Sequence, residues 1–120
     1  MVKYFKYGTS DVLECSCGCG MKLDNCFLER VDEARELAGV PFKVNSGARC
    51  LDYNRTVGSK DTSTHVIGKA MDIAYEDELD VARIVHALSR VGFTRIGLNS
   101  DKKFIHVDKD PEKPDVVFGY

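Results

Sequence analysis

Two helical patterns, separated by short apolar runs, limit this chain to a fold that combines helices with strands. Apolar residues recur every three or four positions over 25–38, and Gly39 and Pro41 then act as stop signals. A second and stronger helical pattern covers 76–92, with acidic residues in its first turn. The shorter runs suit strands, and the last two of them would close a hairpin: 41–47, 69–75, 94–98 and 103–108. The order of these segments predicts an α+β fold.

Two further segments lack a clear pattern. Residues 48–64 are rich in turn-forming and polar residues, and we expect a long loop there that lines a functional site. The tail 109–120 contains two prolines, and we expect it to run irregularly over the surface. Because the 120 residues contain no repeat or linker, they should form a single domain, 1–120, around one core.

The charge balance argues against a nucleic acid or an anionic membrane as the partner. There are 17 basic and 19 acidic residues, which give a net charge of −2, and the basic residues form no long run. No stretch is apolar enough for a signal peptide or a transmembrane helix. We therefore expect a soluble protein that is cytoplasmic as synthesised. The sequence does not fix the oligomeric state, for which a monomer is the expectation.

A carboxylate within a predicted strand raises the first question about function. Asp72 lies in the apolar run 69–75, and His65 precedes it by seven residues. A charge beside buried apolar residues is costly unless it is paired or bound to a metal, so Asp72 needs a partner. His65 and Asp72 therefore begin a candidate metal site.

His106 is the candidate for a third ligand. Zinc hydrolases commonly hold the metal by three side chains drawn from His, Asp, Glu and Cys, and leave a fourth position for water. In the predicted strand 103–108, alternation places His106 and Asp108 on the same face. Each histidine could equally be an ordinary hydrogen-bonded residue. His86 is left out of the site, because it lies in a predicted helix with no carboxylate or cysteine near it in sequence.

The motifs resemble those of a known peptidase family. The segments SGARC, YN, STHVIGKAMDIAY and FIHVD contain the patterns SGxR, SxHxxGxAxD and HxD in that order, over about 42–108. This arrangement is similar to that of the M15 family of zinc D-Ala-D-Ala peptidases, particularly its small branch of phage and bacterial cell-wall enzymes. The resemblance implies the M15-type, Hedgehog-like fold, in which a small antiparallel sheet carries the zinc site and two helices flank it.

The resemblance also implies roles for individual residues. The family's Zn²⁺ ligands match His65, Asp72 and His106, and its substrate-binding arginine matches Arg49. That arginine meets the substrate carbonyl or carboxylate near the metal. A guanidinium suits this role because it is a permanently charged fork that can hold an oxyanion, although the residues alone leave a surface arginine open.

The sequence departs from the family at the proton acceptor. Several branches carry a Glu or His shortly before the last zinc ligand, where this chain has Lys103, whose charged amine cannot accept a proton. Two carboxylates remain in reach. Asp108 is the favoured catalytic candidate, either as the base or as a residue that orients a ligand. Asp101 would need its predicted turn to fold inward.

Five cysteines stand apart from these motifs: Cys15, Cys17, Cys19, Cys26 and Cys50. Their spacing is not the CxxC pair of a zinc ribbon, and their odd number argues against a closed disulfide framework. Because Cys50 directly follows Arg49, a bridge to Cys50 would stiffen the substrate loop. A disulfide or packed thiols are favoured over a second metal site, which stays open.

These residues together predict a zinc metallopeptidase. The resemblance implies peptidoglycan stem or cross-bridge peptides as partners, cut by a carboxypeptidase or an endopeptidase during lysis or remodelling of the cell wall. Without a signal peptide, the protein would stay in the cytoplasm or reach the wall through a lysis system of the kind that phage enzymes use. The missing acid before His106 keeps an alternative open, a pseudo-peptidase that binds zinc and cell-wall peptides without turnover.

Overall fold

The computed structural model describes residues 2–7 and 12–120. Its helices are α1 (Asn25–Ala38), α2 (Leu51–Thr56), the short 3₁₀ helix η1 (Thr64–Ile67) and α3 (Glu78–Arg90). Its strands are β1 (Lys43–Ser46), β2 (Ala70–Ala74), β3 (Arg95–Asn99), β4 (Phe104–Asp108) and β5 (Val116–Gly119). Residues 1 and 8–11 lie outside the described residues. They belong to the N-terminal stretch in which the sequence predicts no signal peptide.

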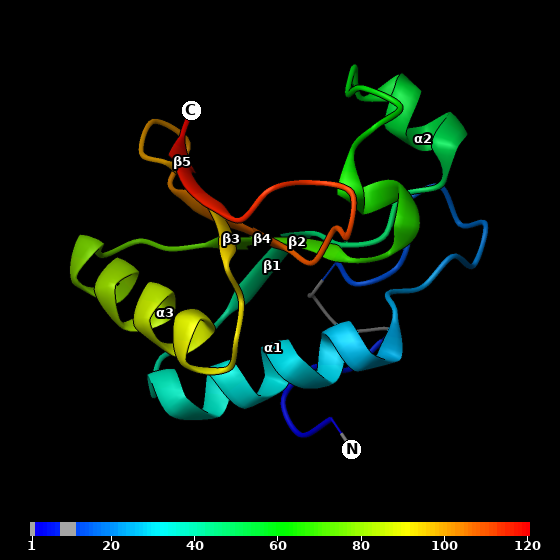
Figure 1. Ribbon diagram of the computed structural model, residues 1–120. Helices are drawn as coiled ribbons and strands as arrows, with labels where there is room; N and C mark the ends of the chain where they lie inside the picture. Colours follow the sequence, from blue (N-terminus) through cyan, green and yellow to red (C-terminus); the bar gives the residue numbers. More distant parts are fainter. Residues whose placement is uncertain (1, 8–11) are drawn as a thin grey trace.

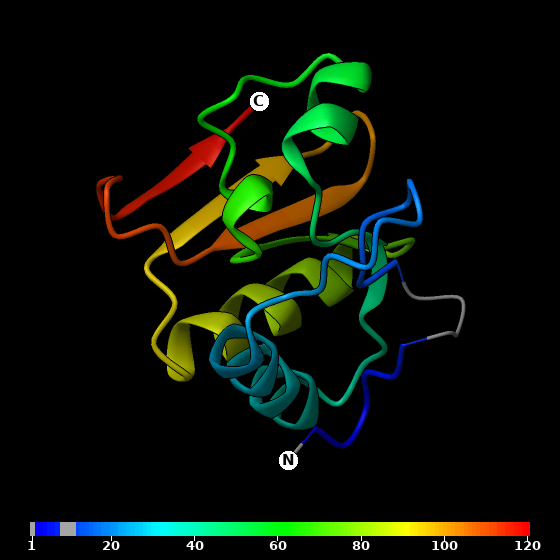
Figure 2. The same cartoon turned by 90° about the vertical axis from the view of Figure 1, so that its right-hand side faces the viewer.

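The strands form one mixed sheet in the order β1-β2-β4-β3-β5. The pairs β1–β2, β2–β4 and β3–β4 are antiparallel, whereas β5 runs parallel to β3. The predicted α+β class and the hairpin of β3 and β4 are confirmed. The strands that carry the metal residues are antiparallel, as predicted, but the sheet as a whole is mixed, because the tail returns along the outer edge of β3 and pairs with it in parallel (Figure 2).

Helices α1 and α3 cover one face of the sheet, and α2 and η1 lie over the other (Figures 1 and 2). The core fills the space between the sheet and the two long helices. Its strand residues are fully buried: Met71, Ile73, Ile105 and Val107. Because these residues alternate with Asp72 and His106, the burial that builds the core also turns the two polar side chains to the opposite face.

The two long helices lie where the sequence predicts them. α1 begins after Asp24, whose carboxylate accepts a hydrogen bond from the Phe27 amide at 3.0 Å, and it ends at Gly39 in the left-handed conformation. α3 lies within the predicted range 76–92 and begins after Asp77, which accepts a hydrogen bond from the Leu79 amide. No helix in the described residues is long and apolar enough to cross a membrane.

The segment 48–64 is not the irregular loop that the sequence predicts, because it contains α2 and the start of η1. The two predicted helices therefore become three α-helices in the described part of the chain. α2 has only six residues, of which Asn54 alone is buried, so it has no apolar stripe that a sequence pattern could reveal. Its first turn is held by Cys50, whose sulfur accepts a hydrogen bond from the Tyr53 amide. Helices this short depend on such contacts, which local sequence preferences do not predict.

The tail is not irregular either, since it ends in β5. Val116 and Val117 are exposed on this edge strand, so the tail shows no alternation of apolar and polar residues. The side chains of Thr94 and Arg95 hold the tail directly before β5. Thr94 donates a hydrogen bond to the Asp115 carboxylate at 2.7 Å, and Arg95 donates to the Pro114 carbonyl at 3.0 Å. The parallel pairing of β5 thus rests on contacts between distant segments.

Candidate metal centre

Strand pairing brings Asp72 and His106 together. The two residues are direct partners in the antiparallel pair of β2 and β4. Their neighbours Ile73 and Ile105 are also partners and face the core, so both polar side chains point to the other face of the sheet. Asp72 Oδ1 lies 2.9 Å from His106 Nδ1.

His65 reaches the same point from η1, rather than from an irregular loop. Ser63 caps this 3₁₀ helix, where its hydroxyl accepts a hydrogen bond from the His65 amide at 3.4 Å. The helix ends at Gly68, whose left-handed backbone (φ 72°) turns the chain into β2. A side chain at Gly68 would also press on the Lys22 carbonyl at 3.1 Å. The close approach of this turn to the N-terminal segment fixes His65 above the sheet.

The three predicted metal ligands converge. His65 Nε2 lies 3.4 Å from Asp72 Oδ2, and one ligand atom from each of His65, Asp72 and His106 lies within 4.8 Å of the others. The side chains are largely buried, with 4% of His65, 14% of Asp72 and 13% of His106 exposed. We refer to these three residues as the metal cluster.

Hydrogen bonds on the outer side of each imidazole set which nitrogen faces Asp72. His65 Nδ1 lies 2.6 Å from the Gly47 carbonyl oxygen, which can only accept, so this nitrogen carries the proton and Nε2 presents a lone pair. His106 Nε2 lies 2.6 Å from the Asp108 carboxylate, which leaves Nδ1 as the nitrogen that faces Asp72.

The donor set fits a zinc ion. An imidazole lone pair and a carboxylate repel each other at hydrogen-bond distance. The cluster is therefore stable only when a cation lies between the imidazoles and the carboxylate, or when one imidazole is protonated. Neutral imidazole nitrogen and carboxylate oxygen are both ordinary zinc ligands, and three protein ligands are typical of catalytic rather than structural zinc sites. The metal cluster therefore has the chemistry of a metal centre with an open position.

The pKa values of Asp72 and His106 are both shifted toward the charged form of the side chain. Burial raises the pKa of Asp72, but the adjacent imidazoles of His106 and His65 outweigh burial and hold its pKa well below the usual range. Burial lowers the pKa of His106, but its hydrogen bonds to Asp108 and Asp72 outweigh burial and raise its pKa above the usual value. The cluster therefore stabilises a cation, whether a proton on His106 or a metal ion.

Asp108 lies on the far side of His106 from Asp72. Its side chain is 1% exposed, and Oδ2 accepts hydrogen bonds from His106 Nε2 at 2.6 Å and from Arg95 Nε at 3.1 Å. It shares the strand face of His106, as the alternation predicts, but it is not among the residues that line the pocket above the cluster. These contacts suit a residue that orients an imidazole.

Arg49 lies on the other side of the cluster. Its Nη2 atom is 4.0 Å from Asp72 Oδ2, and Nη1 donates a hydrogen bond to Asn54 Oδ1 at 3.2 Å. Its Nε atom is buried and has no hydrogen-bond partner within the described part of the chain. Asn54 is fully buried and also donates to the Lys60 carbonyl at 2.8 Å. Asn54 belongs to the YN segment of the family motifs, but the sequence gave it no role, because a polar residue in an expected loop does not reveal that it is buried.

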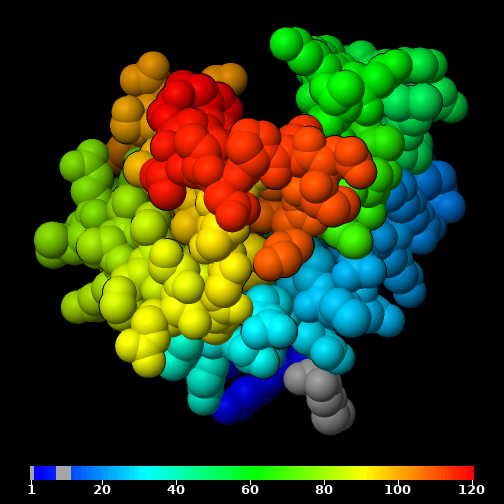
Figure 3. All heavy atoms as spheres, in the orientation of Figure 1, coloured from blue at the N-terminus to red at the C-terminus, as the bar shows by residue number. Residues whose placement is uncertain are grey.

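A pocket of about 270 Å³ opens above the metal cluster. Five further residues line it: Arg49, Ser59, Ser63, Phe104 and Tyr120. In Figure 3 the surface is hollowed between the red C-terminal residues and the green segment that includes α2. The metal cluster therefore lies in an open cleft, where a peptide can reach it.

Tyr120 is a pocket residue that the sequence did not suggest. Its ring packs against Phe104 and Phe118, at centroid distances of 5.6 and 5.5 Å. Gly97 makes room for this aromatic group, because a side chain there would lie 2.6 Å from the Phe118 ring. Burial, and to a lesser extent the Asp72 charge, raise the pKa of Tyr120 above its usual value, so its hydroxyl stays a hydrogen-bond donor.

Asp101, the other candidate for the proton acceptor, lies outside the pocket, as does Lys103, which occupies the position of the family's acid or base. Lys103 and Asp101 are exposed in the turn between β3 and β4, where Lys103 adopts the left-handed conformation (φ 54°). Neither residue lines the pocket above the cluster. Asp72 is the sole carboxylate among the described residues that line it.

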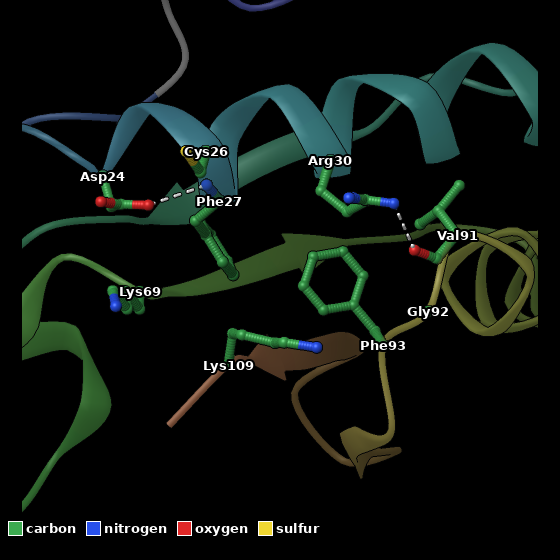
Figure 4. A pocket seen from close by; sticks show the side chains of 9 residues that line it. All are labelled: Asp24, Cys26, Phe27, Arg30, Lys69, Val91, Gly92, Phe93 and Lys109. Atoms are coloured by element: carbon green, nitrogen blue, oxygen red, sulfur yellow. Dashed lines mark hydrogen bonds between the residues drawn. The ribbon is translucent and has the colours of Figure 1, made fainter. Parts of the chain in front are cut away.

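A second pocket, of about 320 Å³, lies beside α1 and the end of α3 (Figure 4). Its polar lining is mainly cationic, from Arg30, Lys69 and Lys109, and Arg30 Nη1 donates a hydrogen bond to the Val91 carbonyl at 3.3 Å. No residue of the metal cluster lines it, so it is separate from the predicted site. Cys26 lines this pocket, away from the other cysteines.

The remaining four cysteines form a second group with metal-ligand geometry: Cys15, Cys17, Cys19 and Cys50. All five cysteines are free thiols in the structure. The bridge to Cys50 that the sequence left open is therefore not formed, although Cys50 does lie beside the N-terminal cysteines.

Comparison with known protein families agrees with the motifs and the geometry. The sequence model of the family described as Peptidase M15 matches residues 6–108, a range that contains the whole metal cluster together with Arg49 and Asp108. A comparison with curated proteins found no match. The α+β fold with a mixed sheet and three helices is consistent with a small peptidase of this kind. The chain therefore belongs to the peptidase M15 family.

Proposed function

We propose that this protein is a zinc-dependent peptidase that hydrolyses peptide bonds in the stem or cross-bridge peptides of peptidoglycan. The observation that carries the proposal is the convergence of His65, Asp72 and His106 at the base of an open pocket, with Arg49 in its wall. Family membership supports the peptidase activity. The zinc requirement and the substrate are inferred from the donor set and from the pocket.

The residues that line the pocket have separate roles in this proposal. His65, Asp72 and His106 would hold the metal, and a zinc ion bound there would supply a Lewis acid and an activated water. Arg49 can hold the carbonyl or a terminal carboxylate of the peptide, because it lines the pocket and its guanidinium is a permanently charged, forked donor. Tyr120, whose hydroxyl stays protonated, can donate a hydrogen bond to the same group.

The pocket favours small residues around the cleaved bond. Its volume of about 270 Å³ is modest, and Phe104 and Tyr120 restrict one side of it. Alanine side chains of either hand, as found in stem peptides, fit such a space better than aromatic residues do. A permanently charged arginine near the metal also suits a free carboxylate, which a carboxypeptidase substrate presents.

Asp108 acts in this proposal as a positioning residue. It holds the His106 Nε2 proton and so keeps Nδ1 available to the metal, a role that outer hydrogen-bond partners commonly play at metal sites. Of the two roles that the sequence left open, its burial and its bond to Arg95 favour this one over that of a base. The proton acceptor is then a group other than Asp108.

A catalytically inactive pseudo-peptidase is the second candidate. The observation in its favour is that Asp72, itself a predicted ligand, is the sole carboxylate among the described residues that line the pocket. Hydrolysis commonly uses a positioned group to take the proton of the attacking water. Such a protein would bind zinc and cell-wall peptides and release no product.

The test is a digest of purified peptidoglycan by the purified protein, first treated with a chelator and then reloaded with zinc. Product release that stops with the chelator and returns with zinc is expected. Free D-Ala among the products indicates a carboxypeptidase, and cross-link fragments indicate an endopeptidase. Asp72→Asn should abolish release, whereas His86→Ala, an exposed histidine on α3, should not.

Two results would contradict the peptidase proposal in different ways. If the protein binds zinc and peptide but releases no metal-dependent product, it is a pseudo-peptidase. A protein that binds no metal, and in which His65→Ala changes neither stability nor peptide binding, would instead be an interaction domain.

A further inference from the structure

We propose that Cys15, Cys17, Cys19 and Cys50 form a second metal site, a structural site for a thiophilic divalent cation such as zinc. This thiolate site would tie the N-terminal segment to the residue that follows Arg49. It is separate from the metal cluster, and the proposal does not depend on catalytic activity.

The distances between the sulfur atoms suit a tetrahedral site. The four sulfurs all lie within 4.8 Å of one another. Cys15 and Cys17 are 3.4 Å apart, and Cys17 and Cys50 are 3.6 Å apart. A tetrahedral ion with metal–sulfur bonds of about 2.3 Å separates its ligands by roughly 3.8 Å. The group therefore needs little movement to close on a metal.

The N-terminal segment is folded so that the sulfurs of Cys15, Cys17 and Cys19 lie close together. The Cys15 carbonyl accepts a hydrogen bond from the Gly18 amide at 3.2 Å, and the Cys15 amide donates to the Met21 carbonyl at 2.8 Å. Gly18 and Gly20 both adopt left-handed backbone angles, with φ of 84° and 89°. The CSCGCG sequence thus forms a tight turn, in which the glycines supply the curvature and the cysteines the ligands.

Backbone amides already point at the sulfurs. The Cys50 amide donates to Cys15 Sγ at 3.3 Å, and the Tyr53 amide donates to Cys50 Sγ at 3.4 Å. Hydrogen bonds of this kind favour the thiolate, which is the form that binds a metal. The position of Cys50 at the start of α2 brings the fourth ligand to the other three.

The arrangement distinguishes a metal site from a disulfide. A disulfide uses two sulfurs, and its bond of about 2.05 Å is much shorter than the separations in this group. Cys17 Sγ lies near both Cys15 Sγ and Cys50 Sγ, an arrangement of one group of four sulfurs that a tetrahedral ion can bind together. Cys17 and Cys19 are exposed and Cys15 is buried, so an ion can enter from solvent and be held against the protein.

The thiolate site would stabilise the wall of the active-site pocket. Cys50 follows Arg49, whose amide donates a hydrogen bond to the His65 carbonyl at 3.0 Å. The N-terminal segment also pairs with the residue before Arg49, where the Ala48 amide donates to the Leu13 carbonyl at 3.0 Å. A metal at the four cysteines would therefore hold the backbone on both sides of Arg49.

Cobalt substitution of the full-length protein tests this site directly, because thiolate ligands give intense charge-transfer absorption in the near ultraviolet. The wild-type protein should bind one ion at each of the two groups, with a thiolate spectrum from one of them. Cys17→Ser with Cys19→Ser should lose one ion and the charge-transfer band. Cys26→Ser, the matched control outside the group, should keep both ions and the band.

The active-site variant separates this proposal from the proposed function. Asp72→Asn should lose one ion yet keep the thiolate band, and a chelator should still lower its melting temperature. If Cys17→Ser with Cys19→Ser fails to fold, Cys19→Ser alone, at an exposed position, should weaken the charge-transfer band, because it removes one of the four thiolates. A wild-type protein without a thiolate band would overturn the proposal. So would a non-reduced mass lower by the hydrogens of a disulfide among these four cysteines.

Discussion

Asp72 on β2 and His106 on β4 are direct partners across the sheet, and 2.9 Å separates Asp72 Oδ1 from His106 Nδ1. The pairing is set by the core, because Ile73 and Ile105 form the adjacent pair on the buried face. A shift of either strand by one residue would turn its polar side chain into the core. The geometry of the metal cluster is therefore as well defined as the packing of the sheet.

Replacing a residue of the metal cluster should remove metal binding at this site. His65→Ala deletes one of three predicted ligands, so zinc affinity should fall by more than about 100-fold, beyond the loss seen on changing an outer hydrogen-bond partner. Equilibrium dialysis with metal analysis measures the affinity. His86→Ala is the control, and equal zinc binding by both variants would show that His65 is not a ligand.

Asp108→Asn should weaken metal binding without removing it. The amide keeps an oxygen that can accept from His106 Nε2, but it lacks the charge that polarises the imidazole and pairs with Arg95. We expect zinc affinity to fall by about 10–100-fold. Zinc titration of the purified variant measures this fall. A variant that keeps full zinc affinity but loses all turnover would instead point to Asp108 as the base.

Asn54→Ala should impair catalysis through Arg49. Asn54 Oδ1 accepts from Arg49 Nη1, and its amide donates to the Lys60 carbonyl, so the alanine variant loses the support of the guanidinium. We expect kcat/KM to fall by roughly 10–100-fold and stability by about 1–3 kcal/mol, with zinc content unchanged. Steady-state kinetics and metal analysis on the same sample test this. Loss of zinc in step with activity would contradict the role assigned to Asn54.

Gly47→Ala should destabilise the fold by overpacking. An added side chain would lie 2.5 Å from the Leu13 carbonyl oxygen and 2.7 Å from that of Val12, and neither backbone atom can move freely. The cost should be about 1–3 kcal/mol, measured by chemical denaturation. Gly119→Ala is the matched control, since its nearest contact would be the Leu98 carbonyl at 3.8 Å. An equal effect at both positions would argue against the close approach at Gly47.

Asp110 should make stability depend on acid pH. Burial raises its pKa, but hydrogen bonds from the Glu112 amide, Thr64 and Lys113 outweigh burial and lower it below the ordinary 3.8. A lowered folded-state pKa contributes stability above the unfolded pKa, and this contribution is lost as the pH falls through the folded value.

Comparison with Asp110→Asn isolates the acid-pH effect. The variant should be less stable at neutral pH by about 1–2 kcal/mol, because its amide pairs less well with Thr64 and Lys113. The difference from wild type should shrink below about pH 4. Urea denaturation at several pH values measures it, and a difference that does not change with pH would rule out a contribution from the Asp110 charge.

The long helices and the central strands were predictable because their signals are local. α1 and α3 show an apolar stripe, a capping aspartate and a terminal glycine, and in β2 and β4 the polar residues Asp72 and His106 are each flanked by buried apolar ones. The two short or edge elements were not predictable. α2 is held by Cys50 and Asn54, and β5 is an exposed edge strand, so neither carries an apolar pattern of its own.

The sequence by itself determined the chemistry of the site, because the motifs around His65, Asp72 and His106 specify which side chains meet, and the residue types specify what they can bind. Only the tertiary structure decided how those side chains are supported. Tyr120 packs beside Phe104 in the pocket and Cys50 lies beside the N-terminal cysteines, and both contacts join segments that are distant in sequence. Asn54 supports Arg49 only because the chain between them turns into α2. Such contacts depend on the packing of the whole chain, which no local pattern encodes.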